Sequence, residues 1–100
     1  MNLQAIQKKV EPIFSRYGVV QAFIFGSFAR GEETENSDID LLIEYAPNAR
    51  KSMFDFCKMI EELKDELGRD VDVVTVKGLS PFLRDIVEKE KRVIYDNKSA

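Results

Sequence analysis

The chain has 100 residues, of which 44% are hydrophobic and 33% charged, with a formal net charge of −3. This composition indicates one soluble globular domain spanning residues 1–100. The acidic balance argues against general nucleic-acid binding, which requires a basic surface. The chain contains no histidine, which excludes Ser-His-Asp and Cys-His hydrolases and most zinc sites.

The cysteine content and the N-terminus predict a cytoplasmic protein. A lone Cys57 excludes an internal disulfide and a CxxC redox motif, which favours a reducing compartment. Residues 1–10 are polar and mixed in charge, unlike a signal peptide. The longest uncharged stretch, residues 17–29, is far shorter than the ~20 apolar residues that a membrane span requires.

The first half of the chain predicts two helices and two strands. Apolar residues at three- and four-residue spacing predict an amphipathic helix over 3–17, which Pro12 should kink or split. The apolar run 19–25 predicts a strand that is covered on both faces. A short helix at 27–31 and a second strand at 38–45 follow, joined by a polar loop.

The second half predicts a strong helix, a strand, another helix and a short edge strand. The helix over 50–67 should bury one apolar face that includes Met53 and Cys57. A third strand covers 70–76, and residues 92–95 form an edge strand. The helix between them opens at Ser80-Pro81 and is expected to bury the apolar side chains Phe82, Leu83, Ile86 and Val87. The order predicts a small α/β or α+β fold, a mixed sheet of three to four strands with helices packed against it.

Two short motifs lie at the ends of the first two strands. The Gly26-Ser27 turn would direct backbone N–H groups and a hydroxyl toward a phosphate chain. Asp38 and Asp40 lie on the same face of the second strand, roughly 7 Å apart at Cα. Two carboxylates so placed can bind one divalent cation or bridge two. Together the motifs suggest a phosphoryl- or nucleotidyl-transfer site.

Two better-known motifs do not fit this stretch. The glycines of a Walker A loop are present, but Glu32-Glu33 stand where lysine and serine or threonine are required. Asp38-x-Asp40 begins like an EF-hand loop, but Leu42 occupies the third ligand position and Ile43 the invariant glycine. The chain is therefore predicted to be neither a P-loop NTPase nor an EF-hand protein.

Each acidic residue also has a simpler interpretation, as a solvated side chain. Apolar neighbours draw Asp38 and Asp40 toward the core, however, and burying bare carboxylates costs several kcal/mol unless cations or donors compensate. Asp72 is a candidate third acid, preferred over Asp70 because valines flank it. The alternative is that Asp72 is simply a solvated side chain on an edge strand. Arg30 is either merely exposed or in contact with a triphosphate.

The segment GSFARGEETENSDIDLLI resembles the G-S-x-x-R-G…S-D-x-D-L signature of the DNA polymerase beta-like nucleotidyltransferases. Chain size and the third acid in VDVVT resemble their minimal nucleotidyltransferase (MNT) branch. The resemblance implies a polymerase beta-like fold and a site with three carboxylates and two Mg²⁺ ions. It implies transfer of a nucleoside monophosphate from ATP or another NTP to an acceptor hydroxyl.

By the same resemblance, Gly26 and Ser27 would hold the triphosphate, and Asp38 and Asp40 would bind both Mg²⁺ ions. Asp72 would complete the metal set and help the acceptor lose its proton. Arg30, beside the phosphate-holding turn, is the further candidate contact to the nucleotide.

The resemblance also implies a partner, because members of this branch often pair with a HEPN-domain toxin and act as its antitoxin by adenylylating it. We expect a hetero-oligomer in which the partner contacts a rim formed by Phe28, Arg30 and the loop 32–37. The alternative is a non-catalytic antitoxin, a binding module that neutralises its partner by contact alone.

Overall fold

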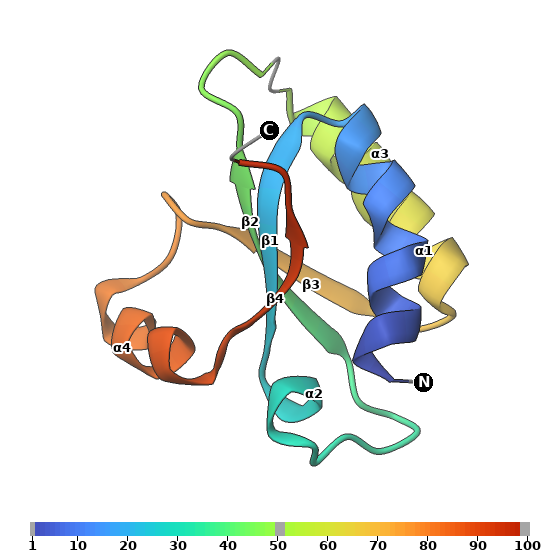
Figure 1. Cartoon of the computed structure of the whole chain (residues 1–100), viewed down its shortest axis with the longest axis vertical. Helices are drawn as coiled ribbons and strands as arrows, with labels where there is room; N and C mark the ends of the chain where they lie inside the picture. Colours follow the sequence, from blue (N-terminus) through green and yellow to red (C-terminus); the bar gives the residue numbers. More distant parts are fainter. Residues whose placement is uncertain (1, 50–51, 99–100) are drawn as a thin grey trace.

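The computed structural model describes residues 2–49 and 52–98, which form a four-stranded sheet with helices on both faces (Figure 1). The strands are β1 (Val19–Phe25), β2 (Ile39–Tyr45), β3 (Val71–Thr75) and β4 (Arg92–Asp96). Their order across the sheet is β3-β2-β1-β4. β1 pairs antiparallel with β2 and β4, whereas β2 and β3 are parallel. The predicted mixed sheet and its edge strand at the C-terminal end are confirmed.

Two long helices cover one face of the sheet, α1 (Leu3–Arg16) and α3 (Met53–Leu67). The side chain of Asn2 caps α1, and that of Ser52 caps α3 by accepting from the N–H of Asp55. The predicted split at Pro12 does not occur, because α1 is one helix from residue 3 to residue 16. Its buried face anchors both sides of the proline. The predicted start of α3 at residues 50 and 51 lies outside the described residues.

The opposite face of the sheet carries α4 (Pro81–Glu90), and α2 (Ser27–Arg30) follows the end of β1 (Figure 1). The main core fills the space between the sheet and α1 and α3. A much smaller cluster lies on the other face, formed by Phe23, Leu42, Leu79 and Val87. β1 is therefore covered on both faces, as predicted, but unequally. Across the described residues, no helix is both long and apolar enough to cross a membrane.

The predicted apolar face of α3 was partly wrong. Cys57 is exposed and so is Met53, whereas Met59 is completely buried. The buried stripe runs through Phe56, Met59, Ile60, Leu63 and Leu67. Residue 57 lies about 200° around the helix axis from residue 59, so that a stripe centred on Met59 turns the cysteine outward.

The prediction for α4 was also largely wrong. Phe82 is 90% exposed, Leu83 50% and Ile86 52%. Val87 alone is buried within α4, all of whose residues are described. Val87 and the preceding Leu79 pack against Phe23 and Leu42 of the sheet, whereas Phe82, Leu83 and Ile86 face away from this cluster and remain exposed.

Candidate functional site

The predicted site residues lie on three adjacent segments at one end of the sheet. Asp40 of β2 is the register partner of Phe25 in antiparallel β1 and of Asp72 in parallel β3. Gly26 directly follows Phe25, so the turn and two of the three acids are brought side by side. Asp70 instead precedes β3 and uses its backbone carbonyl to accept from the N–H of Ile39.

Gly26 lies directly against the carboxylate of Asp40, in a backbone conformation that favours glycine. Gly26 has φ of +74° and ψ of −151°, a conformation that side chains rarely adopt. A methyl group at this position would overlap Oδ2 of Asp40 and lie 3.2 Å from its Cγ. The glycine of the turn thus makes room for the carboxylate.

Electrostatics tie the three predicted acids together. Burial raises the pKa of the half-buried Asp40, and the carboxylates of Asp72 and Asp38 raise it further; Arg30 opposes them. Asp38 and Asp72 remain exposed, so the expectation that apolar neighbours would draw these acids inward holds only for Asp40. The carboxylates of Asp72 and Asp38 are therefore each close enough to Asp40 to disfavour its negative charge.

These carboxylates fit a hard divalent cation in chemistry but are not arranged as a closed cage. Within residues 2–49 and 52–98, no group of three or more acidic, histidine or cysteine side chains converges tightly enough to hold a metal ion. The donors are all carboxylate oxygens, which Mg²⁺ prefers, and the raised pKa of Asp40 marks a negative charge that a cation would stabilise. The exposed side chains of Asp38 and Asp72 have room to turn toward Asp40.

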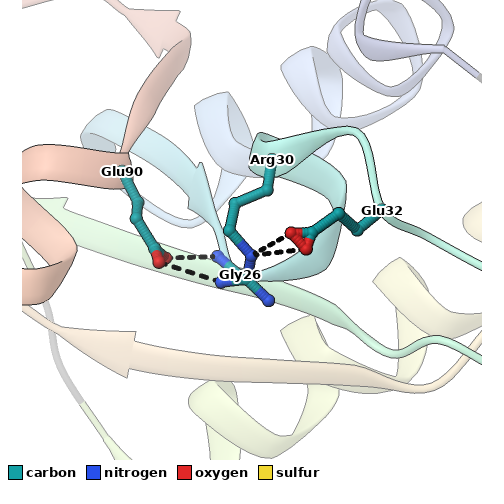
Figure 2. Close-up of polar contacts among 4 residues, drawn as sticks. All are labelled: Gly26, Arg30, Glu32 and Glu90. Atoms are coloured by element: carbon teal, nitrogen blue, oxygen red, sulfur yellow. Dashed lines mark hydrogen bonds and ion pairs between the residues drawn. The ribbon is translucent and has the colours of Figure 1, made fainter.

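Arg30 is held by two glutamates (Figure 2). Its Nη1 donates to Oε1 of Glu90 over 2.9 Å, and its Nε donates to Oε1 of Glu32 over 3.1 Å. The second oxygen of Glu90 accepts from the backbone N–H of Gly26 at 3.4 Å. Sequence reasoning missed Glu90, because it lies 60 positions from Arg30 on a helix whose charged side chains resemble an ordinary solvated face.

Arg69 fastens the loop that leads into Asp38. Its Nη1 donates to three backbone carbonyls, those of Thr34 at 2.9 Å and of Glu35 and Ser37 at 3.2 Å. Its guanidinium lies over the ring of Phe28, 5.1 Å from the centroid. Phe28 is therefore buried, and the prediction that it forms part of an exposed rim was wrong. Sequence reasoning also missed Arg69.

A cleft of about 440 Å³ lies beside this loop. It is lined by Glu35, Asn36, Ser37, Asp38, Lys64, Gly68, Arg69 and Asp70. The cleft borders Asp38 but includes neither Gly26 nor Asp40, so we take the turn and the facing acids, rather than the cleft, as the candidate centre.

The family described as "Nucleotidyltransferase domain" matches residues 6–94, nearly the whole chain. The chain belongs to the nucleotidyltransferase domain family. One relative of this nucleotidyltransferase, from Methanocaldococcus jannaschii, is named as a candidate protein adenylyltransferase. The two are 42% identical over 90 residues, which cover 90% of this chain and 95% of the relative.

Solved structures agree with the expected polymerase beta-like fold of this nucleotidyltransferase. One, described as a candidate minimal nucleotidyltransferase, is 35% identical with a TM-score of 0.74, covering 92% of this chain and 95% of the other. Another is an MNT antitoxin in complex with a tri-AMPylated HEPN toxin of Shewanella oneidensis. It is 18% identical with a TM-score of 0.72, over 97% of this chain and 75% of the other. At 18% identity the second structure shows the fold alone. The predicted resemblance to the MNT branch is confirmed by the structure that is 35% identical.

Proposed function

We propose that this nucleotidyltransferase uses Mg²⁺ to move AMP from ATP to a hydroxyl group of a HEPN-domain toxin, and so acts as the toxin's antitoxin in the cytoplasm. The observation that carries the proposal is the close approach of Asp40 to Gly26. This approach places the carboxylate of Asp40, a group that can bind Mg²⁺, beside the Gly26-Ser27 turn, which can bind a phosphate group. The name of the relative from M. jannaschii supports a protein acceptor, and the HEPN–MNT complex with the same fold supports the partner.

In this proposal the turn binds the nucleotide and the acids prepare the reaction. The N–H of Gly26, the hydroxyl of Ser27 and the guanidinium of Arg30 contact the triphosphate. Asp38 and Asp40 would hold two Mg²⁺ ions, with Asp72 completing the set. Such ions, when bound, stabilise the attacking and leaving oxygens of an in-line displacement.

The chemical step needs no protein nucleophile. The acceptor oxygen forms a bond to the α-phosphorus while the bond to pyrophosphate breaks, and pyrophosphate leaves with the electron pair. The carboxylate of Asp72 takes the acceptor's proton. Asp72 is exposed, so that a hydroxyl presented by another protein can reach it. Positioning and electrostatics then supply most of the catalysis.

The acidic net charge favours a folded protein over a free nucleic acid strand as the acceptor. We expect the partner to contact Arg30 and the exposed part of the loop 32–37. Phe28 is excluded from this contact by its burial.

A second candidate is a non-catalytic antitoxin that neutralises its partner by contact. Two observations favour it: the carboxylates do not converge into a closed cage, and Arg30 is already paired with Glu90 and Glu32. Under this interpretation the site is idle or only holds a nucleotide.

The test is incubation of the purified chain and its HEPN partner with each labelled NTP and Mg²⁺, followed by intact mass of the partner. We expect a gain of one or more AMP groups with ATP, abolished by chelation of the metal and by Asp40→Asn. A stable complex without any mass gain would favour the contact-only antitoxin. If the two proteins neither co-elute nor react, the acceptor lies elsewhere.

A further inference from the structure

Glu90 makes a bridging contact that the proposed reaction does not use. It is the last residue of α4, and its side chain is 22% exposed. One carboxylate oxygen pairs with Nη1 of Arg30 at 2.9 Å, and the other accepts from the N–H of Gly26 at 3.4 Å (Figure 2). The carboxylate therefore spans the two donors that were assigned to the nucleotide.

A carboxylate and a phosphate present similar pairs of oxygens to a guanidinium and to backbone N–H groups. Arg30 and Gly26 therefore cannot make these bonds to Glu90 and the same bonds to a phosphate. The negative charge of Glu90 also adds to those of Asp72 and Asp38 around Asp40. Both effects oppose an incoming polyphosphate.

Glu90 can leave without unpacking the core. Within α4, every residue of which is described, Val87 alone is buried, and it lies one turn before Glu90. Lys91 caps the C-terminal end of the helix by donating its N–H to the carbonyl of Val87. A change of side-chain rotamer at Glu90 would break both contacts and leave this end of the helix intact.

We propose that Glu90 is an internal competitor of the triphosphate, occupying the place of a phosphate between Arg30 and Gly26 until a nucleotide displaces it. Glu90 is then an affinity-determining residue of the site, although it does not touch the reacting atoms. The inference rests on the proposed function, because it requires a nucleotide to use the same two donors.

The experiment measures the Kd of inorganic tripolyphosphate without metal, and of AMP-PNP with Mg²⁺, by calorimetry. Glu90→Gln removes the charge and should tighten tripolyphosphate binding about five-fold, the size of one partly exposed ion pair. Glu88→Gln is the matched control: this glutamate lies on the same helix and pairs with Lys91, so its variant should bind like the wild type.

Two further variants separate contact from long-range charge. Glu90→Asp keeps the charge but shortens the side chain by one methylene, so competition by contact predicts tighter binding than in the wild type. An unchanged Kd in this variant would assign the effect to charge alone and overturn the proposal. In an Arg30→Gln background, Glu90→Gln should lose most of its effect, because the shared donor is gone.

Binding by Glu90→Gln that equals that of the wild type would also overturn the inference. Weaker binding would overturn it too, because it would indicate that Glu90 orients Arg30 for the nucleotide. Transfer of AMP to the partner is measured in parallel. If Glu90→Gln transfers AMP at the wild-type rate but binds tripolyphosphate no more tightly, the proposed function stands and the role of Glu90 as a competitor is refuted. If no variant binds tripolyphosphate or AMP-PNP, both proposals fall.

Discussion

Gly26 leaves the space that Oδ2 of Asp40 fills, and any side chain at position 26 would overlap that carboxylate. Gly26→Ala should therefore lower the free energy of unfolding by about 2–3 kcal/mol, because it adds this overlap to a backbone conformation that suits only glycine. Urea denaturation measures the change.

Gly31→Ala is the control for this first prediction. Gly31 also has positive φ, at +73°, but nothing lies within 4 Å of an added Cβ among the described residues. It should lose only the roughly 1 kcal/mol of a left-handed backbone. Equal losses in the two variants would show that the overlap with Asp40 is not felt.

Asp38→Asn and Asp40→Asn should each abolish transfer and leave the fold intact. Loss of a metal carboxylate removes several kcal/mol of transition-state stabilisation, a rate loss of about 100-fold or more. Without metal, Asp40→Asn should be slightly more stable than the wild type, because burial and two nearby carboxylates disfavour its charge. Turnover measurements test the predicted loss of transfer, and thermal unfolding tests the predicted gain in stability. Wild-type turnover in either variant would remove these residues from the site.

The raised pKa of Asp40 also predicts how stability depends on pH in the metal-free protein. Between the ordinary carboxyl pKa, about 3.9, and its raised folded value, the folded state binds more protons than the unfolded chain. Asp40 therefore contributes stability that is present below this window and lost as the pH rises through the folded pKa. The stability advantage of Asp40→Asn over the wild type should shrink as the pH falls through the window. An advantage that grows on acidification would contradict the cause assigned to the shift.

Asp72 and Asp70 provide a matched pair on the same strand end. Asp72 is the register partner of Asp40, whereas Asp70 lies before β3. Asp72→Ala should therefore stop transfer to the partner protein, and Asp70→Ala should not. The intact mass of the partner distinguishes the two variants. If Asp70→Ala stops transfer and Asp72→Ala does not, Asp70 rather than Asp72 is the third acid of the site.

Arg69 is a positioning residue for Asp38 rather than a contact to substrate. Arg69→Lys cannot reproduce three carbonyl contacts and the stacking on Phe28. We expect about 10-fold weaker activation by Mg²⁺, typical of residues that orient metal ligands. Saturating Mg²⁺ should restore most of the rate. A rate loss that no Mg²⁺ concentration restores would indicate a direct role for Arg69 in transfer.

The sequence by itself determined the element order and the local chemistry of the centre. The Gly26-Ser27 turn and the spacing of Asp38 and Asp40 depend on residues that are neighbours along the chain. The predicted second strand included Asp38, but β2 begins at Ile39, so Asp38 directly precedes the strand and only Asp40 lies on it. The choice of Asp72 over Asp70 also rested on local flanking residues and stays a prediction; in the strand register Asp72 is the partner of Asp40.

Only the tertiary structure decided which distant groups share the centre. Glu90 lies 60 positions along the chain from its partner Arg30, and Arg69 lies about 30 positions from its partner Ser37. No periodic pattern in the sequence encodes such contacts. The same holds for α4, where apolar spacing predicted a buried face but the sheet offers room for Val87 and leaves Phe82 in solvent. Hydrophobic periodicity reports which side chains can be buried together, whereas burial itself depends on what the rest of the chain places opposite them.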